Sequence, residues 1–222
     1  MDFSLSEEYQ AFRDVVRRWV DAEVPKSWAR ELERDEDNYP FALWDKFTEA
    51  GFHGIGVPEA YGGQGGDVQM QMVLARELAR PLAGLAWIWG MTSFAGTKSI
   101  GVYGTEAQKQ KYLPLMAAGK LKAGISFTEP SGGTDLLGGM RTTAEKVDGG
   151  WVISGEKIWS SSAHVADRLL VLARTNKNVE KRHQGLTLFW VSAKQDGVKI
   201  TKLAKLGMRS MGSCSVHYDR AF

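Results

Sequence analysis

Residues 124–139 read GISFTEPSGGTDLLGG, and the character of the chain changes at this stretch. Upstream of it, apolar residues recur with the period of helices, whereas from about residue 121 onward they alternate as in strands. The stretch therefore predicts an α+β fold, in which an N-terminal all-α helical domain is followed by a small antiparallel β-barrel or β-sandwich domain. We expect the helical domain to span residues 1–121 and the β domain to span residues 122–222.

Helix signals divide the first half of the chain. Residues 4–7, SLSE, have the form of a capping box, and the apolar residues after them predict a helix that stops near Pro25. Asp67 and Thr105 are expected to cap two later helices, because their side-chain oxygens can accept hydrogen bonds from a first turn. Helices are predicted over residues 5–25, 41–50, 67–80 and 105–119, with one or two buried helices between residues 81 and 103.

Seven short segments of the second half have the alternation or the β-branched content of strands. They lie at residues 123–128, 142–147, 151–158, 168–173, 186–191, 198–201 and 215–218. Turn signals separate them, such as the sequences DGG at residues 148–150 and QDG at residues 195–197. Strands this short and this closely spaced favour a small antiparallel barrel or sandwich.

The composition is that of an ordinary globular protein. The chain has 222 residues, of which 43% are hydrophobic and 24% are charged, and its net charge is only +2. Because the basic residues are scattered among acidic ones, we expect neither a nucleic acid nor an anionic membrane as a partner. Residues 81–97 carry no charge but contain three glycines, so we expect a buried helix there and no membrane span.

The cysteine and histidine content argues against metals and disulfides. Cys214 is the only cysteine, which rules out an internal disulfide and disfavours a thiolate metal cluster. The four histidines lack the spacing of metal ligands, so no metal site is expected. The first ten residues, MDFSLSEEYQ, are acidic where a secretory signal needs a basic and then an apolar segment. These features favour a cytoplasmic protein.

The stretch at residues 124–139 also offers groups that suit a phosphate or a cofactor. Thr128 presents a directional hydroxyl, and Gly132 and Gly133 let a ligand approach the main chain with no Cβ in the way. Thr134 and Asp135 can turn the chain and cap a helical segment after them. The alternative is a glycine-rich hairpin without a ligand, because glycine punctuates turns far more often than it marks binding sites.

A second polar cluster comes after the strand predicted at residues 151–158. There Trp159 stands beside the hydroxyls of Ser160, Ser161 and Ser162. An indole plane can stack on a flat heteroaromatic ring while hydroxyls and backbone N–H groups bind the ring's edge, as an isoalloxazine requires. The alternative for Trp159 is a place in the hydrophobic core.

Together these motifs resemble the acyl-CoA dehydrogenase family. The family's middle domain carries a Thr-Glu-Pro, Gly-[Ser/Thr]-Asp signature and, further on, a Gly-[Gln/Glu]-Lys strand that ends in an aromatic residue and a hydroxyl. This chain has both motifs in that order. Further segments that resemble the family are PEAYGGQG at residues 58–65, GTEAQKQKYLP at residues 104–114 and KLGMRS at residues 205–210. The resemblance covers essentially the whole chain and implies the first two of the family's three domains.

The resemblance implies FAD as the cofactor and assigns residues to it. The Thr128 hydroxyl would lie at the pyrimidine edge of the isoalloxazine, Trp159 would pack against the ring, and Ser161 would hydrogen-bond near N5. Gly133 and Thr134 would reach the diphosphate, and Thr134 would also contact the coenzyme A of the substrate. The full set of cofactor-binding residues implied in this way is Ile125, Phe127, Thr128, Gly133, Thr134, Trp159, Ser160 and Ser161.

The activity that the resemblance implies is α,β-dehydrogenation of an acyl-CoA thioester in fatty acid metabolism, with hydride transfer to flavin N5. The family's catalytic glutamate lies in a C-terminal helical domain that we expect this chain to lack, so no residue here is expected to be catalytic. Glu59, Glu129 and Glu156 are accordingly not expected to serve as the base. The implied partners are an acyl-CoA substrate, an electron-transfer flavoprotein as electron acceptor, and further copies of the chain in a homo-oligomer, a dimer or a tetramer.

Other functions stay open from the sequence. One alternative is a non-catalytic module that binds flavin or acyl-CoA, and another is a related flavoenzyme such as an acyl-CoA oxidase or a flavin monooxygenase. The basic segment at residues 177–183 is either a solvated loop or a contact for the phosphates of coenzyme A.

Overall fold

The fold comes from a computed structural model, which describes residues 4–35, 37–181 and 183–222. The chain divides into two compact units. A helical unit comprises Met1–Leu121 together with Leu206–Met211, and a β unit comprises Lys122–Lys205 together with Gly212–Phe222. The short return segment Leu206–Met211 thus belongs to the helical unit although its neighbours in sequence are strands.

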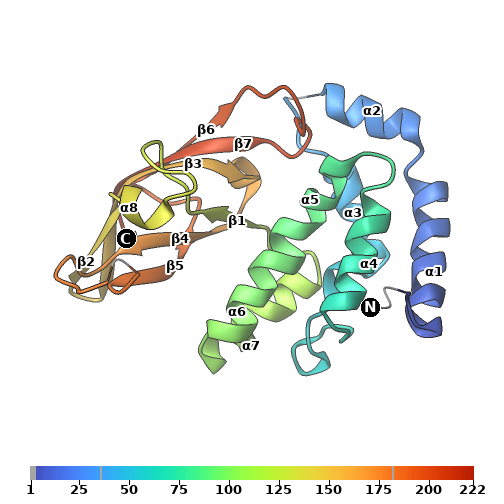
Figure 1. The fold of residues 1–222 in the computed structure, drawn as a ribbon, viewed down its shortest axis with the longest axis horizontal. Helices are drawn as coiled ribbons and strands as arrows, with labels where there is room; N and C mark the ends of the chain where they lie inside the picture. Colours follow the sequence, from blue (N-terminus) through green and yellow to red (C-terminus); the bar gives the residue numbers. More distant parts are fainter. Residues whose placement is uncertain (1–3, 36, 182) are drawn as a thin grey trace. The chain divides into compact units, whose positions relative to one another are not determined.

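The helical unit contains the helices predicted from the sequence and one more. They are α1 (Glu7–Glu23), α2 (Lys26–Arg34), α3 (Phe41–Glu49), α4 (Val68–Leu78), α5 (Ala83–Gly90), α6 (Thr97–Tyr103) and α7 (Glu106–Ala117), with a π-helical segment η3 (Met91–Gly96) and short 3-10 turns η1 (Phe52–Gly54) and η2 (Glu59–Tyr61). The additional helix is α2, which starts directly after Pro25. Segments α5, η3 and α6 follow one another without a break (Figure 1).

The predicted helix caps are correct at two of three places. Asp67 accepts a hydrogen bond from the N–H of Met70, and Thr105 forms a capping box with Gln108. At α1, however, the N-cap is Ser6 and its side chain makes no capping hydrogen bond, so the capping box predicted at residues 4–7 is wrong. The glutamate of that motif, Glu7, is already the first helical residue, too early in the turn to reach back to the cap.

The core of the helical unit forms between α1, α3, α4 and α5. Helix α1 packs against α4, and α4 packs against α5. The largest fully buried side chains of these helices are Leu43, Trp44, Phe47, Leu74, Leu78, Leu85, Ile88 and Trp89. Among the described residues, no helix is both long enough and apolar enough to cross a membrane.

All seven predicted strands are confirmed, with small shifts at their ends. They are β1 (Ala123–Ser126), β2 (Thr143–Val147), β3 (Gly150–Ser161), β4 (Arg168–Arg174), β5 (Leu186–Ser192), β6 (Val198–Leu203) and β7 (Ser213–Ala221). Two short helical segments interrupt them, α8 (Leu136–Gly139) between β1 and β2 and η4 (Ala163–Val165) between β3 and β4.

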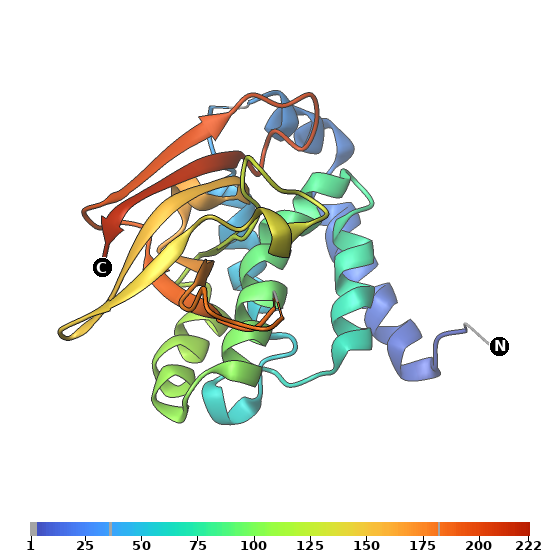
Figure 2. The same cartoon turned by 60° about the vertical axis from the view of Figure 1, so that its left-hand side comes forward.

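The strands form one curled sheet whose order is β1-β4-β2-β3-β7-β6, with β5 paired to β4 (Figures 1 and 2). The sheet is mixed, which corrects the antiparallel prediction. Strand β1 runs parallel to β4, with Ala123 opposite Arg168, and β2 also pairs with β4 in parallel orientation. The remaining pairs are antiparallel.

The inner face of the curled sheet carries the hydrophobic core of the β unit. Its buried members come from β2, β3, β4, β5 and β7, and include Ala144, Ile153, Leu169, Val171, Val191, Val216 and Tyr218. Trp151 and Phe189 cover the margin of this core in an edge-on contact, with ring centroids 5.6 Å apart. This core anchors β3, the strand that carries the tryptophan singled out in the sequence.

Replacement of Gly155 by alanine is expected to destabilise the β unit by about 2 kcal/mol or more. Gly155 has φ +146, and an added Cβ would lie 2.5 Å from Thr142 Oγ1 and 2.6 Å from Thr142 Cα. Urea unfolding of the purified chain measures this effect. Gly133→Ala is the matched control, because its Cβ would meet nothing within 4 Å. Equal stability of the two variants would contradict the expectation.

Candidate functional site

A β-bulge in β3 pushes Trp159 out of the sheet. Lys157 lies opposite Val216 and Ser160 lies opposite Cys214, so three steps along β3 match two along β7. Within the bulge, Trp159 adopts φ 59, a conformation rare for a large side chain, and its side chain is 56% exposed. A large side chain held in a strained and solvent-exposed position is a candidate for ligand binding, because strained residues concentrate at functional sites.

The exposed indole borders a surface hollow of about 510 Å³. Its lining comes from the loop after β1 and from the bulge of β3, and consists of Thr128, Glu129, Pro130, Ser131, Gly132, Gly133, Ile158 and Trp159. The backbone N–H of Ile158 donates to Thr128 O at 2.8 Å and joins the two segments. The hollow therefore brings together Thr128, Gly133 and Trp159, which the sequence motifs assigned to one site.

The adjacent glycines of the loop differ in their surroundings. A Cβ on Gly132 would lie 3.1 Å from Gly139 Cα, so Gly132 permits two backbone segments to touch inside the loop. A Cβ on Gly133 would meet nothing within 4 Å. The main chain at Gly133 thus faces open space and is accessible to a ligand. Asp135 caps the short helix α8 by accepting a hydrogen bond from Gly138 N at 2.9 Å, as the sequence predicted.

A buried ion pair lies beneath the hollow. The Lys157 side chain is 0% exposed and the Glu129 side chain 3% exposed, and Lys157 Nζ lies 3.0 Å from Glu129 Oε1. Glu129 also accepts hydrogen bonds from the backbone N–H groups of Arg141, at 2.6 Å, and Thr142, at 2.9 Å. The sequence motifs gave Lys157 no role.

The environment of Glu129 keeps its carboxyl group ionised. Burial by itself would raise its pKa, but the hydrogen bonds from Arg141, Thr142 and Lys157 stabilise the carboxylate and hold the pKa below its ordinary value. The charged form of Glu129 is thus committed to three donors of the protein itself.

Behind the bulge lies a chain of buried hydroxyls. Tyr218 Oη donates to Ser126 Oγ at 2.9 Å, and Ser126 Oγ lies 3.0 Å from Ser160 Oγ. Burial raises the pKa of the Tyr218 phenol, which stays neutral. The Ser160 side chain is fully buried and therefore faces the interior, away from the exposed indole that precedes it. This placement leaves the Ser160 main chain, and not its hydroxyl, for contact with a ligand.

The other residues assigned from the sequence are not among the described residues that line the hollow. Ile125 and Phe127 alternate with buried Ser126, so their half-buried side chains lie on the opposite face of the strand from that hydroxyl. Thr134 is exposed and follows Gly133 directly. Ser161 is half-buried and lies opposite Ser213 of β7.

Near the end of β3, His164 couples the stability of the β unit to pH. Burial, and then the positive charges of Lys202 and Lys205, lower the pKa of His164 from 6.5 to about 4. Between these values the unfolded chain binds a proton that the folded chain does not. The free energy of unfolding is therefore expected to fall as the pH is lowered from 6.5 towards 4, and to keep this contribution in full above 6.5.

Urea unfolding at about pH 7 and about pH 5 measures this dependence. His164→Gln, which cannot titrate, is expected to flatten the difference. Equal stability of the wild-type chain at both pH values would contradict the assignment.

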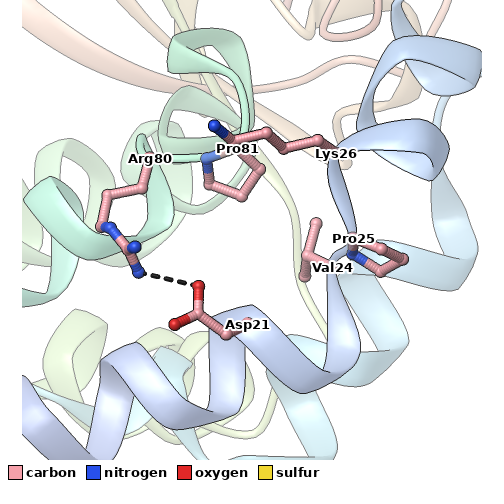
Figure 3. Close-up of a pocket in the computed structure, with 6 residues that line it drawn as sticks. All are labelled: Asp21, Val24, Pro25, Lys26, Arg80 and Pro81. Atoms are coloured by element: carbon pink, nitrogen blue, oxygen red, sulfur yellow. Dashed lines mark hydrogen bonds and ion pairs between the residues drawn. The ribbon is translucent and has the colours of Figure 1, made fainter.

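Two smaller hollows lack the features of the first. One, of about 300 Å³, lies in the helical unit and is lined by Asp21, Val24, Pro25, Lys26, Arg80 and Pro81 (Figure 3). Asp21 and Arg80 form an ion pair at 2.9 Å across it. Neither an aromatic plane nor a glycine contributes to this lining, so we assign it no cofactor.

The other hollow, of about 330 Å³, lies beside α8 and includes Arg174, Lys177 and Glu180 in its lining. It contains part of the basic segment at residues 177–183, whose Arg182 lies outside the described residues. Across the residues that the structure describes, no group of three or more histidine, cysteine, aspartate or glutamate side chains is placed to hold a metal ion.

The geometry suits a flat aromatic ligand that carries a phosphate. The exposed indole offers a stacking face, the Thr128 hydroxyl offers an edge contact, and the open main chain at Gly133 allows close approach of an anionic group. Sequence reasoning missed Lys157 at this site, and also Met140, whose Sδ lies 3.2 Å from Lys157 Nζ. A signal existed for Lys157, because a lysine at an inward-facing strand position needs a buried acceptor, and Glu129 lies in the neighbouring motif.

Comparison with known proteins shows that two domain models of one family match this chain. The acyl-CoA dehydrogenase N-terminal domain matches residues 6–120, and the acyl-CoA dehydrogenase middle domain matches residues 124–221. A glutaryl-CoA dehydrogenase from Desulfococcus multivorans is 34% identical, over 99% of this chain and 56% of its own length. The chain spans about half the length of the curated relatives it matches.

Solved structures agree with the sequence comparison. The complex of glutaryl-coenzyme A dehydrogenase with glutaryl-CoA superposes with a TM-score of 0.90 at 31% identity, covering 100% of this chain and 56% of that chain. An acyl-CoA dehydrogenase complexed with FAD from Bacillus anthracis superposes with a TM-score of 0.82 at 30% identity, covering 98% of this chain and 36% of that chain.

Proposed function

Because the chain belongs to the acyl-CoA dehydrogenase family, we propose that it takes part in the FAD-dependent α,β-dehydrogenation of an acyl-CoA thioester. The observation that carries this proposal is the hollow that joins Thr128, Gly133 and Trp159. The residues present fit a flavin, since the indole is exposed and the main chain at Gly133 is open. When bound, FAD supplies the hydride acceptor.

In this proposal the side chains of the site hold and orient the flavin. Trp159 covers one face of the isoalloxazine, and the Thr128 hydroxyl binds its pyrimidine edge. Ser161 places a hydroxyl near N5, while Gly133 and Thr134 approach the diphosphate. The remaining contacts are made by the side chains of Ile125 and Phe127 and by the main chain of Ser160.

We assign no catalytic base within the hollow. Glu129 is the only carboxylate among the eight described residues that line it, and its charge is committed to Lys157 and two backbone N–H groups. Glu59 and Glu156 are exposed side chains outside this lining. The residues of this hollow therefore act by binding and positioning.

The substrate class that we propose is an acyl-CoA thioester, with Thr134 in contact with its coenzyme A. The glutaryl-CoA complex of a solved relative supports this class. We further propose that the chain has a helical domain at residues 1–121 and a β domain at residues 122–222, from which the segment Leu206–Met211 returns to the helical unit. We also propose that it passes electrons to an electron-transfer flavoprotein, forms a dimer or tetramer, and works in the cytoplasm.

The visible absorption spectrum of the purified chain tests the proposed cofactor. After incubation with FAD and desalting, we expect a flavin spectrum whose bands are shifted relative to free FAD, because the isoalloxazine is taken out of water and stacked. A colourless protein after this treatment would count against the proposal. Anaerobic bleaching of the bound flavin by acyl-CoA thioesters then tests the proposed reaction.

A non-catalytic module that binds flavin or acyl-CoA is the second candidate. The ion pair of Glu129 with Lys157 favours this candidate, because the hollow has no other carboxylate among its described residues that could act as a base. Retention of FAD without bleaching by any acyl-CoA would support this alternative. Formation of hydrogen peroxide in air during turnover would instead indicate a related oxidase.

A further inference from the structure

We propose that the buried ion pair of Lys157 and Glu129 is a clamp that sets the conformation of the loop at residues 129–141 before any ligand binds. We name this segment the ligand loop. Lys157 and Glu129 are then positioning residues for the site. The inference rests on the proposed function only for the identity of the ligand.

The three donors of the Lys157 ammonium meet acceptors at both ends of the ligand loop. Lys157 Nζ lies 3.0 Å from Phe127 O, which comes directly after β1. It lies 3.0 Å from Glu129 Oε1, where the ligand loop begins, and 3.2 Å from Met140 Sδ, where the loop ends. An ammonium has three N–H groups, so its hydrogen-bonding capacity is filled by these contacts.

The Glu129 carboxylate closes the ligand loop from the other side. It accepts hydrogen bonds from the N–H groups of Arg141 and Thr142, at the end of the loop. Inside the loop, Gly132 N donates to Glu129 O at 3.0 Å. One residue at the start of the loop thus holds both its end and its first turn.

The same pair fixes the distance between the ligand loop and the bulge of β3. Lys157 precedes Trp159 by two residues, and the N–H of Ile158 between them donates to Thr128 O at 2.8 Å. The loop and the bulge are the two segments that line the hollow. A change at Lys157 therefore alters the spacing between Trp159 and the glycines of the loop.

Stability alone does not explain a buried pair of this kind. Taking two charges out of water is costly, and replacement of a buried pair by apolar side chains is often neutral or stabilising. Loss of one partner, in contrast, leaves an unpaired buried charge. A pair that joins β3 to both ends of the ligand loop is better explained by the geometry it imposes.

Hydrogen–deuterium exchange on the ligand-free chain tests the clamp without any flavin. In Lys157→Met/Glu129→Gln, which removes both charges, we expect the amides of Arg141 and Thr142 and of the ligand loop to exchange at least about tenfold faster, since opening then costs less. The amides of the β4–β5 ladder are expected to keep their rates. Unchanged rates in the loop would overturn the proposal, as would a uniform increase over the whole β unit.

Arg17→Met is the matched control. Arg17 binds Glu77, whose side chain is also 0% exposed, with N···O distances of 2.9 Å, and this pair lies in the helical unit. The control removes a partner of a buried carboxylate without touching the ligand loop. Exchange in the loop is expected to stay at the wild-type rate.

Flavin titration then distinguishes a failure of the clamp proposal from a failure of the proposed FAD cofactor. If the wild-type chain binds FAD, the double variant is expected to bind it at least about tenfold more weakly, because binding must first order the loop. Equal affinity despite a loosened loop would overturn the positioning role. If the wild-type chain binds no FAD, the proposed cofactor is wrong, and the exchange result still decides whether the clamp exists.

Discussion

Trp159→Ala is expected to weaken FAD binding by about 10- to 100-fold and to leave the free energy of unfolding nearly unchanged. Stacking of a flat heteroaromatic ring on an aromatic side chain contributes about 1–3 kcal/mol. The indole is 56% exposed, so its removal takes little from the hydrophobic core. A loss of affinity without a loss of stability is the signature of a side chain that is kept for a ligand.

FAD titration followed by flavin fluorescence measures the affinity, and urea unfolding measures the stability. Trp159→Phe retains an aromatic plane and is expected to stay within several-fold of the wild-type affinity. Trp151→Ala is the contrasting control, because Trp151 packs on the core of the β unit against Phe189. That variant is expected to lose stability. If Trp159→Ala bound FAD with wild-type affinity, Trp159 would not be part of the flavin site.

Gly133→Val is expected to lower FAD affinity at least about tenfold while the chain keeps its wild-type stability. The first carbon of the new side chain would meet nothing within 4 Å, so the fold has room for it. The same carbon occupies the space through which an anionic group would approach the main chain. Gly133→Ala is expected to give a smaller loss in the same direction.

Gly132→Ala, at the neighbouring position, is expected to change stability, in contrast to Gly133→Val. Its Cβ would lie 3.1 Å from Gly139 Cα and 3.2 Å from Asp135 O, so the loop itself must shift. We expect this variant to lose stability as well as affinity. The interpretation would be wrong if Gly133→Val bound FAD as well as the wild-type chain, or if it unfolded more easily than Gly132→Ala.

Local features of the fold follow from the sequence because local interactions determine them. The seven strands appear where the chain alternates between apolar and polar residues or carries a short apolar run, and Asp67 and Thr105 cap their helices through contacts within one turn. Helix α2 escaped prediction because it follows Pro25 at once and only its Ala29 is buried. Its apolar stripe is too short to stand out.

Features that depend on distant parts of the chain were not predictable in this way. Ala123 pairs with Arg168, 45 positions away, and strand alternation carries no information about which strand is its neighbour or in which direction it runs. The parallel contact between β1 and β4 was therefore missed. The same holds for Leu206–Met211, which joins the helical unit through hydrogen bonds from Arg209 N and Ser210 N to Glu33.

Three of the residues that the sequence motifs assigned to a flavin lie together in the structure, but their local geometry was not predictable. Thr128, Gly133 and Trp159 stood out because hydroxyl, glycine and tryptophan in these motifs suit a flavin, and the structure brings them to one hollow. The inward turn of Ser160 comes from a bulge, which one extra residue in β3 creates. A register shift of this kind depends on the partner strand β7 and leaves no local signal.

The most direct test of the proposed flavin site is an equilibrium titration of the purified chain with FAD, followed by quenching of tryptophan fluorescence. We expect saturable binding of one FAD per chain, with a quenching component that disappears in Trp159→Ala. Gly133→Val is expected to shift the curve to higher FAD concentration. An absence of saturable quenching up to about 100 μM FAD, an affinity weaker than about −5.5 kcal/mol, would contradict the proposed site.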